Sequence, residues 1–589
     1  MDVRLKTPVV AFLTGVLSIG LAWAGAGLRP VGTQVADEPA GNPNETSPQT
    51  GPQEIAELAG KAPKGKRLPS GVFLVGANKT SLAPTPKLYQ PDGSARKDNS
   101  VPAAQWVKEP GECNSPQPPE PDIDPGEPHA SLFPDSTLGW PGHNPNCIYL
   151  GGYGIGPLRA AEGVDEDFGV WVRSIAISNG ATTVVFQIID AVGYFHVYRP
   201  DVCEDCGMLD MRRAISQRVG LPSEEAIAIG ATHTHGGPDG YGGWGGLPKW
   251  YWHQIRDSVI ASAERAVAQL TPARITVGAI DARRFNNERR DYYYSTPDYL
   301  AVWLQARRPT GEVIATLVNY AAHPTLLDDQ NADCNADGCQ KAVLHADWPG
   351  ALNHHLERIN GGTALLFEGG LGNVSPATPP LPEKKAERMT PPQEVDFMGR
   401  ELAELLTADT GRAGTSLRSN DIKTTSVVIE HPVTNWPELG LAAIGAFDRE
   451  FTPGSEGAAP PGAYQWSKQG VGPGAARSCV TASAEQVRTP ISAFKIGELG
   501  VVTGPGELFS NMTEVVKSKA RQSVQAMVFG QTNDSLGYII QSFEFDRTTN
   551  VATEYGTQTA EYEEFFALDP CFGDHVLETQ LALVAELGL

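Results

Sequence analysis

The sequence predicts an α/β fold in which mixed sheets are covered by helices. Short runs rich in β-branched and aromatic residues alternate with segments of helical periodicity, and this alternation is typical of α/β domains. No repeat of fixed period is visible, which argues against a solenoid or a propeller. With 589 residues, 41% of them hydrophobic, the chain can bury a sizeable core. We therefore expect a single large folded domain.

Each predicted element follows from its local pattern. Apolar runs of strand length predict strands at 72–76, 170–177, 182–189, 226–230, 274–280, 299–306, 313–319, 364–368, 424–429 and 499–503. Apolar positions three and four residues apart predict helices at 209–219, 251–270, 348–359 and 394–407, and another from about residue 508.

The N-terminus has the pattern of an export signal. Two basic residues precede an apolar run at 9–26, and Ala-Trp-Ala at 22–24 fits a small-x-small cleavage site. Residues 1–26 are therefore expected to be a signal peptide, with an uncleaved N-terminal membrane anchor as the alternative. Either one places the folded part in a secreted or extracytoplasmic location.

Composition divides the rest of the chain. Residues 27–69 are rich in Pro, Gly and polar residues without apolar periodicity, which predicts a flexible tether. The folded domain is expected from 70 to 589. Residues 92–147 hold many prolines and two cysteines, so we interpret them as an insertion fixed by cross-links.

The charge balance limits the partners. A formal net charge of -23, from 69 acidic and 46 basic residues, repels phosphate backbones, so nucleic acid is not expected as a partner. A local apolar surface can still capture a lipid, which leaves peripheral membrane contact open.

Eight cysteines form an even set, as a disulfide framework in an exported protein requires. They stand at 113, 147, 203, 206, 334, 339, 479 and 571. Cys203 and Cys206 have the spacing of half a zinc knuckle, but no second such pair exists, so disulfides are the favoured interpretation.

Two histidines stand where a predicted strand ends in a glycine-rich turn. His233 and His235 belong to the run Ala-Thr-His-Thr-His-Gly-Gly-Pro, at a typical site position in α/β sheets. If the strand continued, they would point to opposite faces, so that one could bind a metal and the other face the substrate. A polar strand end without function is the alternative.

Two more candidates follow other predicted strands. His323, before Pro324, ends an apolar strand and could supply a second imidazole to zinc, or merely cap the strand. Glu507, in Gly-Pro-Gly-Glu-Leu, could bind metal as a carboxylate or complement a helix dipole.

Four motifs in one order resemble the neutral (alkaline, non-lysosomal) ceramidase family. They are His-Thr-His-Gly-Gly-Pro at 233–238, His-Pro-Thr at 323–325, Gly-Leu-Gly-Asn-Val-Ser-Pro at 370–376 and Pro-Gly-Glu at 505–507. The likeness runs from about Gly76 to Tyr538, which is most of the chain after the tether. It implies a catalytic domain that hydrolyses the N-acyl bond of ceramide, a linear amide, with Zn²⁺ bound by His233, His323, Glu507 and Tyr538. Tyr555 and Tyr562 are alternatives for the tyrosine.

The resemblance also implies roles beside the metal. Zinc polarises a carbonyl and lowers the pKa of bound water, as hydrolysis of an amide demands. His235 is expected to stabilise an oxyanion or to carry a proton to the departing amine, and to contact substrate. Ser375 matches an active-centre serine, either as a nucleophile or as a hydrogen-bonding group.

Several positions depart from the family. Asn373 and Ala377 replace an aspartate and an asparagine around Ser375, which weakens any role of that acid in orienting a histidine or binding a cation. The family's Asn-Arg-Ser-Pro motif is represented only near Arg289, which is the candidate substrate-binding arginine, with a solvated surface charge as the alternative. No C-terminal immunoglobulin-like domain is expected.

An acidic loop and two other functions remain as alternatives. Residues 328–338 resemble the start of a calcium loop, but Leu344 occupies the position of the terminal glutamate, so a structural Ca²⁺ or Mg²⁺ competes with a disulfide-closed loop. Asp347 is expected to cap the helix that follows. A zinc hydrolase acting on another amide or an ester, and a non-catalytic exported lipid-binding protein, are the alternative functions.

Overall fold

The structure is a computed structural model that describes most of the chain from residue 68 onwards. The described ranges are 68–85, 147–152, 159–161, 163–289, 298–327, 342–377, 389–411, 414–435, 438–439, 442, 447–453, 485–520, 523–544 and 562–589. The predicted signal peptide, nearly all of the predicted tether, the insertion up to residue 146 and the acidic loop at 328–338 lie outside these ranges.

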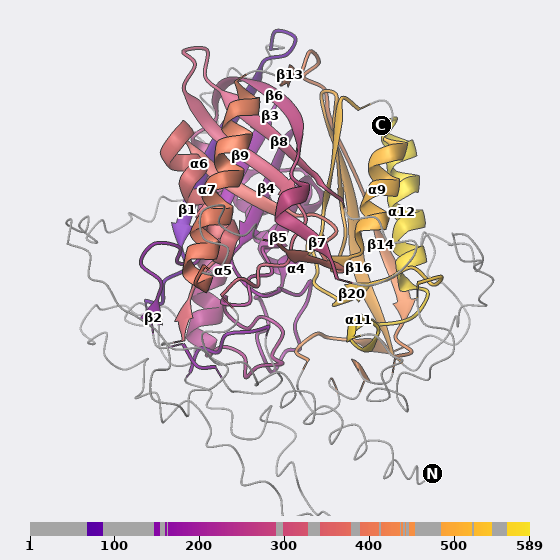
Figure 1. The fold of residues 1–589 in the computed structure, drawn as a ribbon. Coiled ribbons are helices and arrows are strands. Elements are labelled where there is room, and N and C mark those ends of the chain that lie inside the picture. The colour runs from indigo at the N-terminus through magenta and orange to yellow at the C-terminus, as the bar shows by residue number, and fades with distance from the viewer. Residues whose placement is uncertain are drawn as a thin grey trace, which may run out of the picture.

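Two mixed sheets form the centre of the fold (Figure 1). The larger sheet has nine strands among the described residues, in the order β11 (Thr363–Glu368), β9 (Val313–Tyr320), β8 (Leu300–Arg307), β6 (Thr271–Asp281), β1 (Phe73–Ser81), β3 (Trp171–Ser178), β4 (Thr183–Ile189) and β5 (Ile227–Ala231), with β13 (Thr415–Ser416) on β6. The smaller sheet has β14 (Ile422–Pro432), β16 (Glu485–Ile496), β17 (Leu499–Thr503) and β19 (Gln525–Phe529), with β15 (Thr452–Pro453) on β16.

Within the two sheets, three strand pairs run parallel, and they decide where the site lies. These pairs are β4 with β5, β9 with β11, and β17 with β19, while the other pairs in both sheets are antiparallel. Short two-residue and three-residue ladders stand outside the sheets: β2 (Gly163–Val164) with β10 (Val343–Leu344), β7 (Asn286–Glu288) with β12 (Val374–Pro376), and β18 (Glu507–Leu508) with β20 (Tyr538–Ile539).

Helices cover the outer faces of both sheets, which gives four layers (Figure 1). Four helices lie on the larger sheet: α4 (Met208–Val219), α5 (Lys249–Ala268), α6 (Asp347–Asn360) and α7 (Pro391–Thr410). On the smaller sheet lie α9 (Ser510–Lys519) and α12 (Phe572–Leu587). Shorter turns are η3 (Glu224–Ala226), η4 (Arg283–Phe285) and α11 (Tyr562–Phe565). The inner faces of the two sheets pack on each other.

The α/β class and the predicted elements are confirmed, with boundaries that differ by a few residues. β17 has the predicted bounds, whereas β14 is longer than predicted because Lys423, Glu430 and His431 interrupt the apolar strand pattern near its ends. The strands β16 and β19 and the helix α12 were not predicted. β16 contains Pro490, which argues against an interior strand when only the sequence is read.

Aromatic side chains join the two sheets. Phe186 of β4 and Phe367 of β11 meet Phe494 and Phe529 of the smaller sheet. Phe367 and Phe529 stack with ring centroids 4.0 Å apart, and Phe186 contacts Phe494 edge-on at 5.1 Å. All four side chains are buried. Because these rings fill the interface, the relative position of the sheets depends on their packing.

Disulfides are present, as predicted. Cys203 and Cys206 are bonded to each other, and Cys147 and Cys571 are each disulfide-bonded as well. The remaining cysteines lie outside the described residues.

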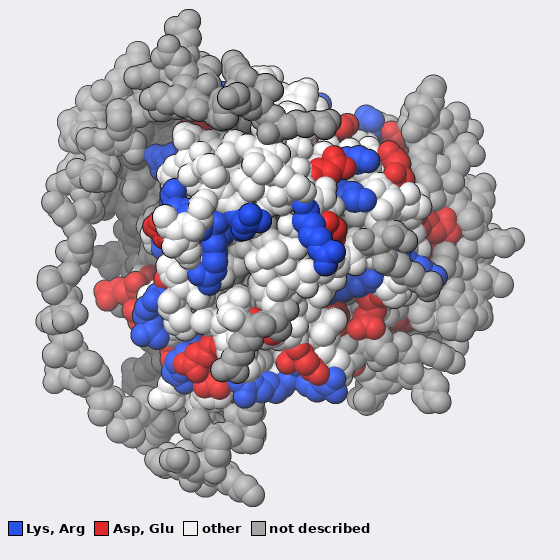
Figure 2. Space-filling model, turned by 90° about the horizontal axis from the view of Figure 1, so that it is seen from above, with Lys and Arg blue, Asp and Glu red and all other residues white. Residues whose placement is uncertain are grey.

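Among the described residues, no helix has both the length and the apolarity needed to cross a bilayer. On the face seen from above in Figure 2, Lys and Arg side chains are interspersed with Asp and Glu.

A buried histidine pair fixes α12 against the smaller sheet. His431 of β14 and His575 of α12 face each other with their Nδ1 atoms 3.0 Å apart, and His431 Nε2 lies 3.1 Å from Asp569 Oδ1. Burial, followed by the neighbouring His431, lowers the pKa of His575 to about 2. The His575 imidazole is therefore neutral in the folded protein at neutral pH.

We expect Phe529→Ala to lower the free energy of unfolding by about 3–5 kcal/mol, because it leaves a cavity between the sheets. Urea unfolding followed by circular dichroism measures the change. Val428→Thr is the matched control on the same sheet, because the Val428 side chain is 42% exposed; its effect should stay within about 0.5 kcal/mol. Equal effects of the two substitutions would contradict the aromatic interface.

We expect stability to fall as the pH drops below the ordinary histidine pKa. The unfolded chain protonates His575 near pH 6.5, whereas the folded chain holds it neutral, so protons favour unfolding. The contribution is roughly 2 kcal/mol between pH 7 and pH 5. His575→Gln should lose less stability over this interval than the parent does. Identical pH dependence of the two proteins would show that His575 does not titrate as described.

Candidate functional site

The candidate site lies where strands of both sheets end. β5, β9 and β11 of the larger sheet and β17 and β19 of the smaller sheet bring their carboxyl ends together. Backbone bonds connect these ends directly: Ala231 N donates to Gln531 O at 2.9 Å, and Gly530 N donates to Glu368 O at 2.8 Å. The loops that follow the strands therefore meet in one place.

His233 and His235 point to the same place, contrary to the alternation expected for a continuing strand. β5 ends at Ala231, and His233 has a φ of 61°, a left-handed conformation that turns the chain out of the strand. The two Nε2 atoms consequently lie 3.4 Å apart. A sequence pattern could not indicate this, because the strand period of two applies only while the strand lasts.

His323 is held by the segment that follows β11. Its backbone N and its Nδ1 both bond to Val374 O, each at 3.0 Å. The His323 carbonyl accepts from Trp348 Nε1 at 3.3 Å. With Nδ1 donating to a carbonyl, the His323 Nε2 carries the lone pair, as in histidines that bind metals.

Asp347 supports this arrangement. It is the first residue of α6 rather than its N-cap, and its carboxylate accepts from the backbone of Trp348 at 2.6 Å and of Leu327 at 3.0 Å. The expected cap is thus replaced by a bridge between α6 and the loop after His323. Burial raises the Asp347 pKa to about 6, against the opposing effect of these backbone donors.

Glu507 and Tyr538 are neighbours in the parallel ladder of β18 and β20. They are register partners, and Glu507 N donates to Gly537 O at 2.8 Å. The Glu507 Oε2 lies 3.1 Å from His323 Nε2 and 3.5 Å from His233 Nε2. The ladder therefore directs the carboxylate to the two imidazoles.

The centre is buried, and burial sets its electrostatics. Burial, followed by the Arg289 charge, lowers the pKa of His323 to about 4. Burial also lowers the pKa of His235 well below its usual value, with His233 and His323 adding to the effect. For Glu507, burial acts to raise the pKa, but the charges and hydrogen bonds of His233 and His323 outweigh it and hold the pKa well below its usual range.

The donor set can hold a metal ion. The imidazole nitrogens of His233, His235 and His323 lie within 4.8 Å of one another, and Glu507 Oε2 contacts two of them. The Nδ1 of His233 lies 2.6 Å from Val192 O, so its Nε2, like that of His323, is the nitrogen left for a metal. Imidazole and carboxylate donors in this number suit zinc.

Arg289 and Tyr538 lie together beside this donor set. Arg289 Nη2 donates to Tyr538 Oη at 2.9 Å and to Gly372 O at 2.6 Å, and its Nε is paired with Glu563 at 2.8 Å. The alternative of a solvated surface charge is excluded by these contacts. The ring centroid of Tyr538 is 6.3 Å from that of His323. Tyr555 lies outside the described residues, and the Tyr562 side chain is not described.

Ser375 follows Val374, whose carbonyl positions His323, and pairs with Asn287 in the β12–β7 ladder. Its side chain is half-buried, and no hydrogen bond joins its hydroxyl to a residue in the described ranges. Ser375 is thus next to the residue that orients a candidate ligand, but it is not joined to the histidines.

Asn373 contacts no histidine of the centre among its described contacts. Its Nδ2 donates to Glu288 Oε2 at 2.6 Å, and its Oδ1 accepts from Ser510 N at 2.8 Å. The amide therefore bridges an acid and a helix start. An ionised aspartate could accept the second bond but could not donate the first.

Two residues near the centre were not predicted. Gln531, with φ of 49°, places its Nε2 3.2 Å from His233 Nδ1. Burial, followed by the Glu507 charge, raises the pKa of the buried Glu438 to about 8, so this carboxyl is mostly protonated at neutral pH. Neither residue belongs to a recognisable motif, so no signal in the sequence indicates them.

Comparison with known proteins finds a likeness to neutral ceramidase in part of the sequence and in the fold. No family model matches the chain. Neutral ceramidase of Pseudomonas aeruginosa is 26% identical over 174 residues, which cover 27% of this chain and 25% of that protein. The crystal structure of neutral ceramidase from Pseudomonas aeruginosa covers 89% of this chain and 75% of its own, with a TM-score of 0.57 and 17% identity. This chain resembles neutral ceramidase over about a quarter of its sequence and shares its fold over most of its length.

A second solved structure, described as ceramidase complexed with C2, agrees with this relation. It covers 88% of this chain and 75% of its own, with a TM-score of 0.55 and 16% identity. The resemblance predicted from the four motifs is confirmed, and so is the α/β fold. The aligned sequence spans only a quarter of the length of the neutral ceramidase, so the fold is shared far more widely than the sequence.

We expect His233→Ala to retain much less added Zn²⁺ than the parent, because it removes one of the converging nitrogens. Metal content after dialysis against a weak chelator, measured by atomic emission, is the readout. His354→Ala is the matched control, since His354 is an exposed histidine of α6. Ser375→Ala should also keep its zinc. Parental zinc content in His233→Ala would remove His233 from the ligand set.

Proposed function

We propose that the chain is a zinc-dependent amidase that hydrolyses the N-acyl bond of ceramide or a ceramide-like lipid, releasing a fatty acid and a sphingoid base. One observation carries the proposal: Glu507 Oε2 lies 3.1 Å from His323 Nε2 and 3.5 Å from His233 Nε2, in a chain that resembles neutral ceramidase. A buried set of two imidazoles and a carboxylate, with a tyrosine beside it, is a donor set typical of catalytic zinc.

His233, His323 and Glu507 would hold the ion, with Tyr538 as the fourth ligand. When bound, Zn²⁺ supplies Lewis acidity towards the amide carbonyl and lowers the pKa of bound water. The carbonyls of Val192 and Val374 orient the two imidazoles, and Arg289 orients Tyr538 through its 2.9 Å hydrogen bond. These outer contacts fix the geometry that the chemistry needs.

His235 is placed to handle protons. Its Nε2 is 3.4 Å from His233 Nε2, so the ring borders the ligand set from the side of the glycine-rich turn. As a neutral imidazole it can accept a proton from the attacking water and deliver it to the amine as the C–N bond breaks. The other role expected of His235 is to donate a hydrogen bond to the developing oxyanion, and the ring can do so from the same position.

Ser375 is assigned a supporting role in this proposal. No histidine among the described residues bonds its hydroxyl and could accept its proton, and an unassisted serine is a weak nucleophile. The backbone next to it holds His323 through Val374. Water is therefore the attacking nucleophile in our reading.

The proposed setting is outside the cytoplasm. The apolar run at 9–26 with its small-x-small site supports export, either with cleavage or as an N-terminal anchor. A lipid amide substrate would then reach the centre from a membrane surface, in a peripheral contact. A structural Ca²⁺ or Mg²⁺ remains part of the proposal only for the loop at 328–338, outside the described residues.

The test is fatty-acid release from short-chain N-acyl sphingosine by the purified full chain, before and after chelation. We expect release to stop on chelation and to return when zinc is added back. Ser375→Ala should retain most of the activity, whereas His235→Gln should lower kcat about 10²–10⁴-fold while zinc stays bound.

Other outcomes distinguish the alternatives. Zinc-dependent turnover of esters or other amides, but not of ceramide, would show that the protein is a zinc hydrolase with a different substrate. Stoichiometric zinc without turnover of any of these substrates would favour a lipid-binding protein. Full turnover after complete metal removal would overturn the zinc-dependent mechanism itself.

A further inference from the structure

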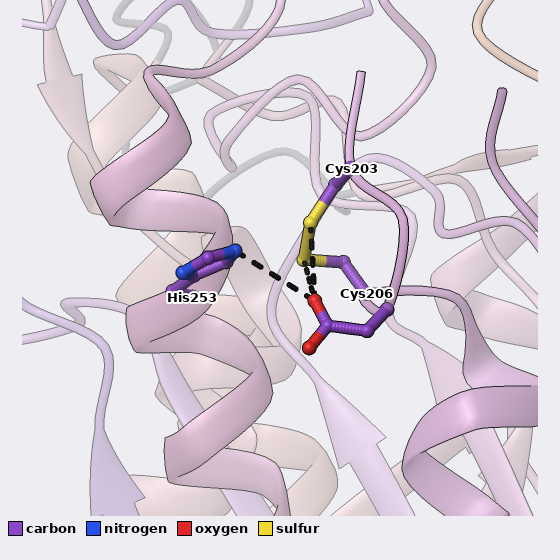
Figure 3. Close-up of side chains that lie close together, drawn as sticks. Cys203, Cys206 and His253 are labelled. Atoms are coloured by element: carbon purple, nitrogen blue, oxygen red, sulfur yellow. Dashed lines mark hydrogen bonds and ion pairs between the residues drawn. A yellow bond between two sulfur atoms is a disulfide. The ribbon is translucent and has the colours of Figure 1, made fainter. Parts of the chain in front are cut away.

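A second group of metal-type ligands lies in a different layer, between α4 and α5. Cys203 and Cys206 precede α4, and His253 projects from the second turn of α5 towards them (Figure 3). Asp205 stands between the two cysteines in the sequence. None of these residues belongs to the centre of His233, His323 and Glu507, and the proposed amidase reaction does not use them.

The ligand atoms of this group are already close together. One donor atom from each of Cys203, Asp205, Cys206 and His253 lies within 4.8 Å of all the others. Asp205 Oδ1 is 3.7 Å from Cys203 Sγ, 3.9 Å from Cys206 Sγ and 3.7 Å from His253 Nε2. The carboxylate oxygen thus lies at nearly equal distances from the two sulfurs and the imidazole nitrogen.

The surroundings hold the four groups in this arrangement. The sulfurs are buried, whereas the Asp205 side chain is 59% exposed, so the cluster opens to solvent on one side. Arg256, one turn after His253, forms an ion pair with Asp205 Oδ2. This pairing leaves Oδ1 on the side of the sulfurs and the imidazole. A structural disulfide alone would require neither His253 nor Asp205 at these positions.

The chemistry of the group matches a borderline-soft divalent cation. Two cysteines with two residues between them provide the spacing found in zinc sites, and an imidazole and a carboxylate complete four ligands. In a tetrahedral site with Zn–S bonds of about 2.3 Å, the sulfurs stand roughly 3.8 Å apart. The disulfide must therefore be reduced before the cation can bind.

We propose that Cys203, Cys206, His253 and Asp205 form a redox-gated site for Zn²⁺ or a similar cation. A dithiol reductant breaks the Cys203–Cys206 bond: it delivers two electrons and two protons, and becomes a disulfide itself. The cation then binds the two thiolates, and the two thiol protons pass to solvent. Oxidation to the disulfide removes both sulfur ligands and closes the site.

The position of the pair favours reduction. Cys206 lies just before the N-terminus of α4, a helix of 12 residues, where the helix dipole stabilises a thiolate. The Arg256 guanidinium adds positive charge beside Asp205. Stabilised thiolates make a disulfide easier to reduce.

The experiment is a Co²⁺ titration of the full chain after reduction in metal-free buffer. Thiolate ligands give a sulfur-to-cobalt charge-transfer band in the near ultraviolet, which a centre of histidines and a carboxylate does not produce. We expect the band to saturate in the reduced protein and to be absent from the oxidised protein. Cys203→Ser/Cys206→Ser should remove it, which excludes the other cysteines as its source.

Single substitutions test the other two ligands. His253→Gln and Asp205→Asn should each weaken Co²⁺ binding at least about tenfold, since even the loss of a supporting contact to a ligand costs that much. Glu204→Gln is the matched control, because Glu204 is an exposed acid between the same cysteines, and its affinity should equal that of the parent. Affinity unaffected by both His253→Gln and Asp205→Asn overturns the four-ligand site.

A further variant needs no reductant, so the protein is tested without opening its other disulfides, which could unfold it. Cys203→Ser leaves the Cys206 thiol available while the other disulfides stay closed. Co²⁺ should still give a weaker charge-transfer band, and Cys203→Ser/His253→Gln should lose affinity. A missing band in both the reduced parent and Cys203→Ser, with free thiol confirmed by titration, overturns the proposal.

Discussion

The buried amide of Asn319 connects the two sheets at the level where the site forms. Its Nδ2 donates to Phe367 O, Glu368 O and Val528 O, and its Oδ1 accepts from Val528 N at 3.0 Å. Asn319 is fully buried, so each bond lost there would leave a polar group without water. This contact fixes β9 and β11 relative to β19. The candidate ligands that follow β9 and the neighbouring strands β5 and β17 are thereby brought to one point.

This constraint explains why the site draws on distant segments. The loops after β5 and β9 supply histidines, and the segment between β17 and β20 supplies Glu507 and Tyr538. No one of these loops could position a ligand alone. The backbone carbonyls of Val192 and Val374 then set the ring orientation, which couples the chemistry of the centre to the folding of the whole molecule.

Much of the fold could be predicted from the sequence, because strongly apolar strands such as β4 and β17 show their pattern without ambiguity. The strand-terminal positions of His323 and Glu507 could also be predicted. The side-by-side rings of His233 and His235 could not, since they depend on one left-handed residue. Glu438 could not be predicted either, because its raised pKa comes from a burial that no local motif reveals.

The bond between Asn373 and Glu288 has a consequence for how this centre can change over evolution. With Glu288 at 2.6 Å, an aspartate at 373 would face a second carboxylate, and one of the two would have to take up a proton or move away. Substitutions at the two positions are therefore not independent. A lineage can carry an ionised acid at 373 only with a partner at 288 that is not a second carboxylate, so the two sites are expected to covary among relatives.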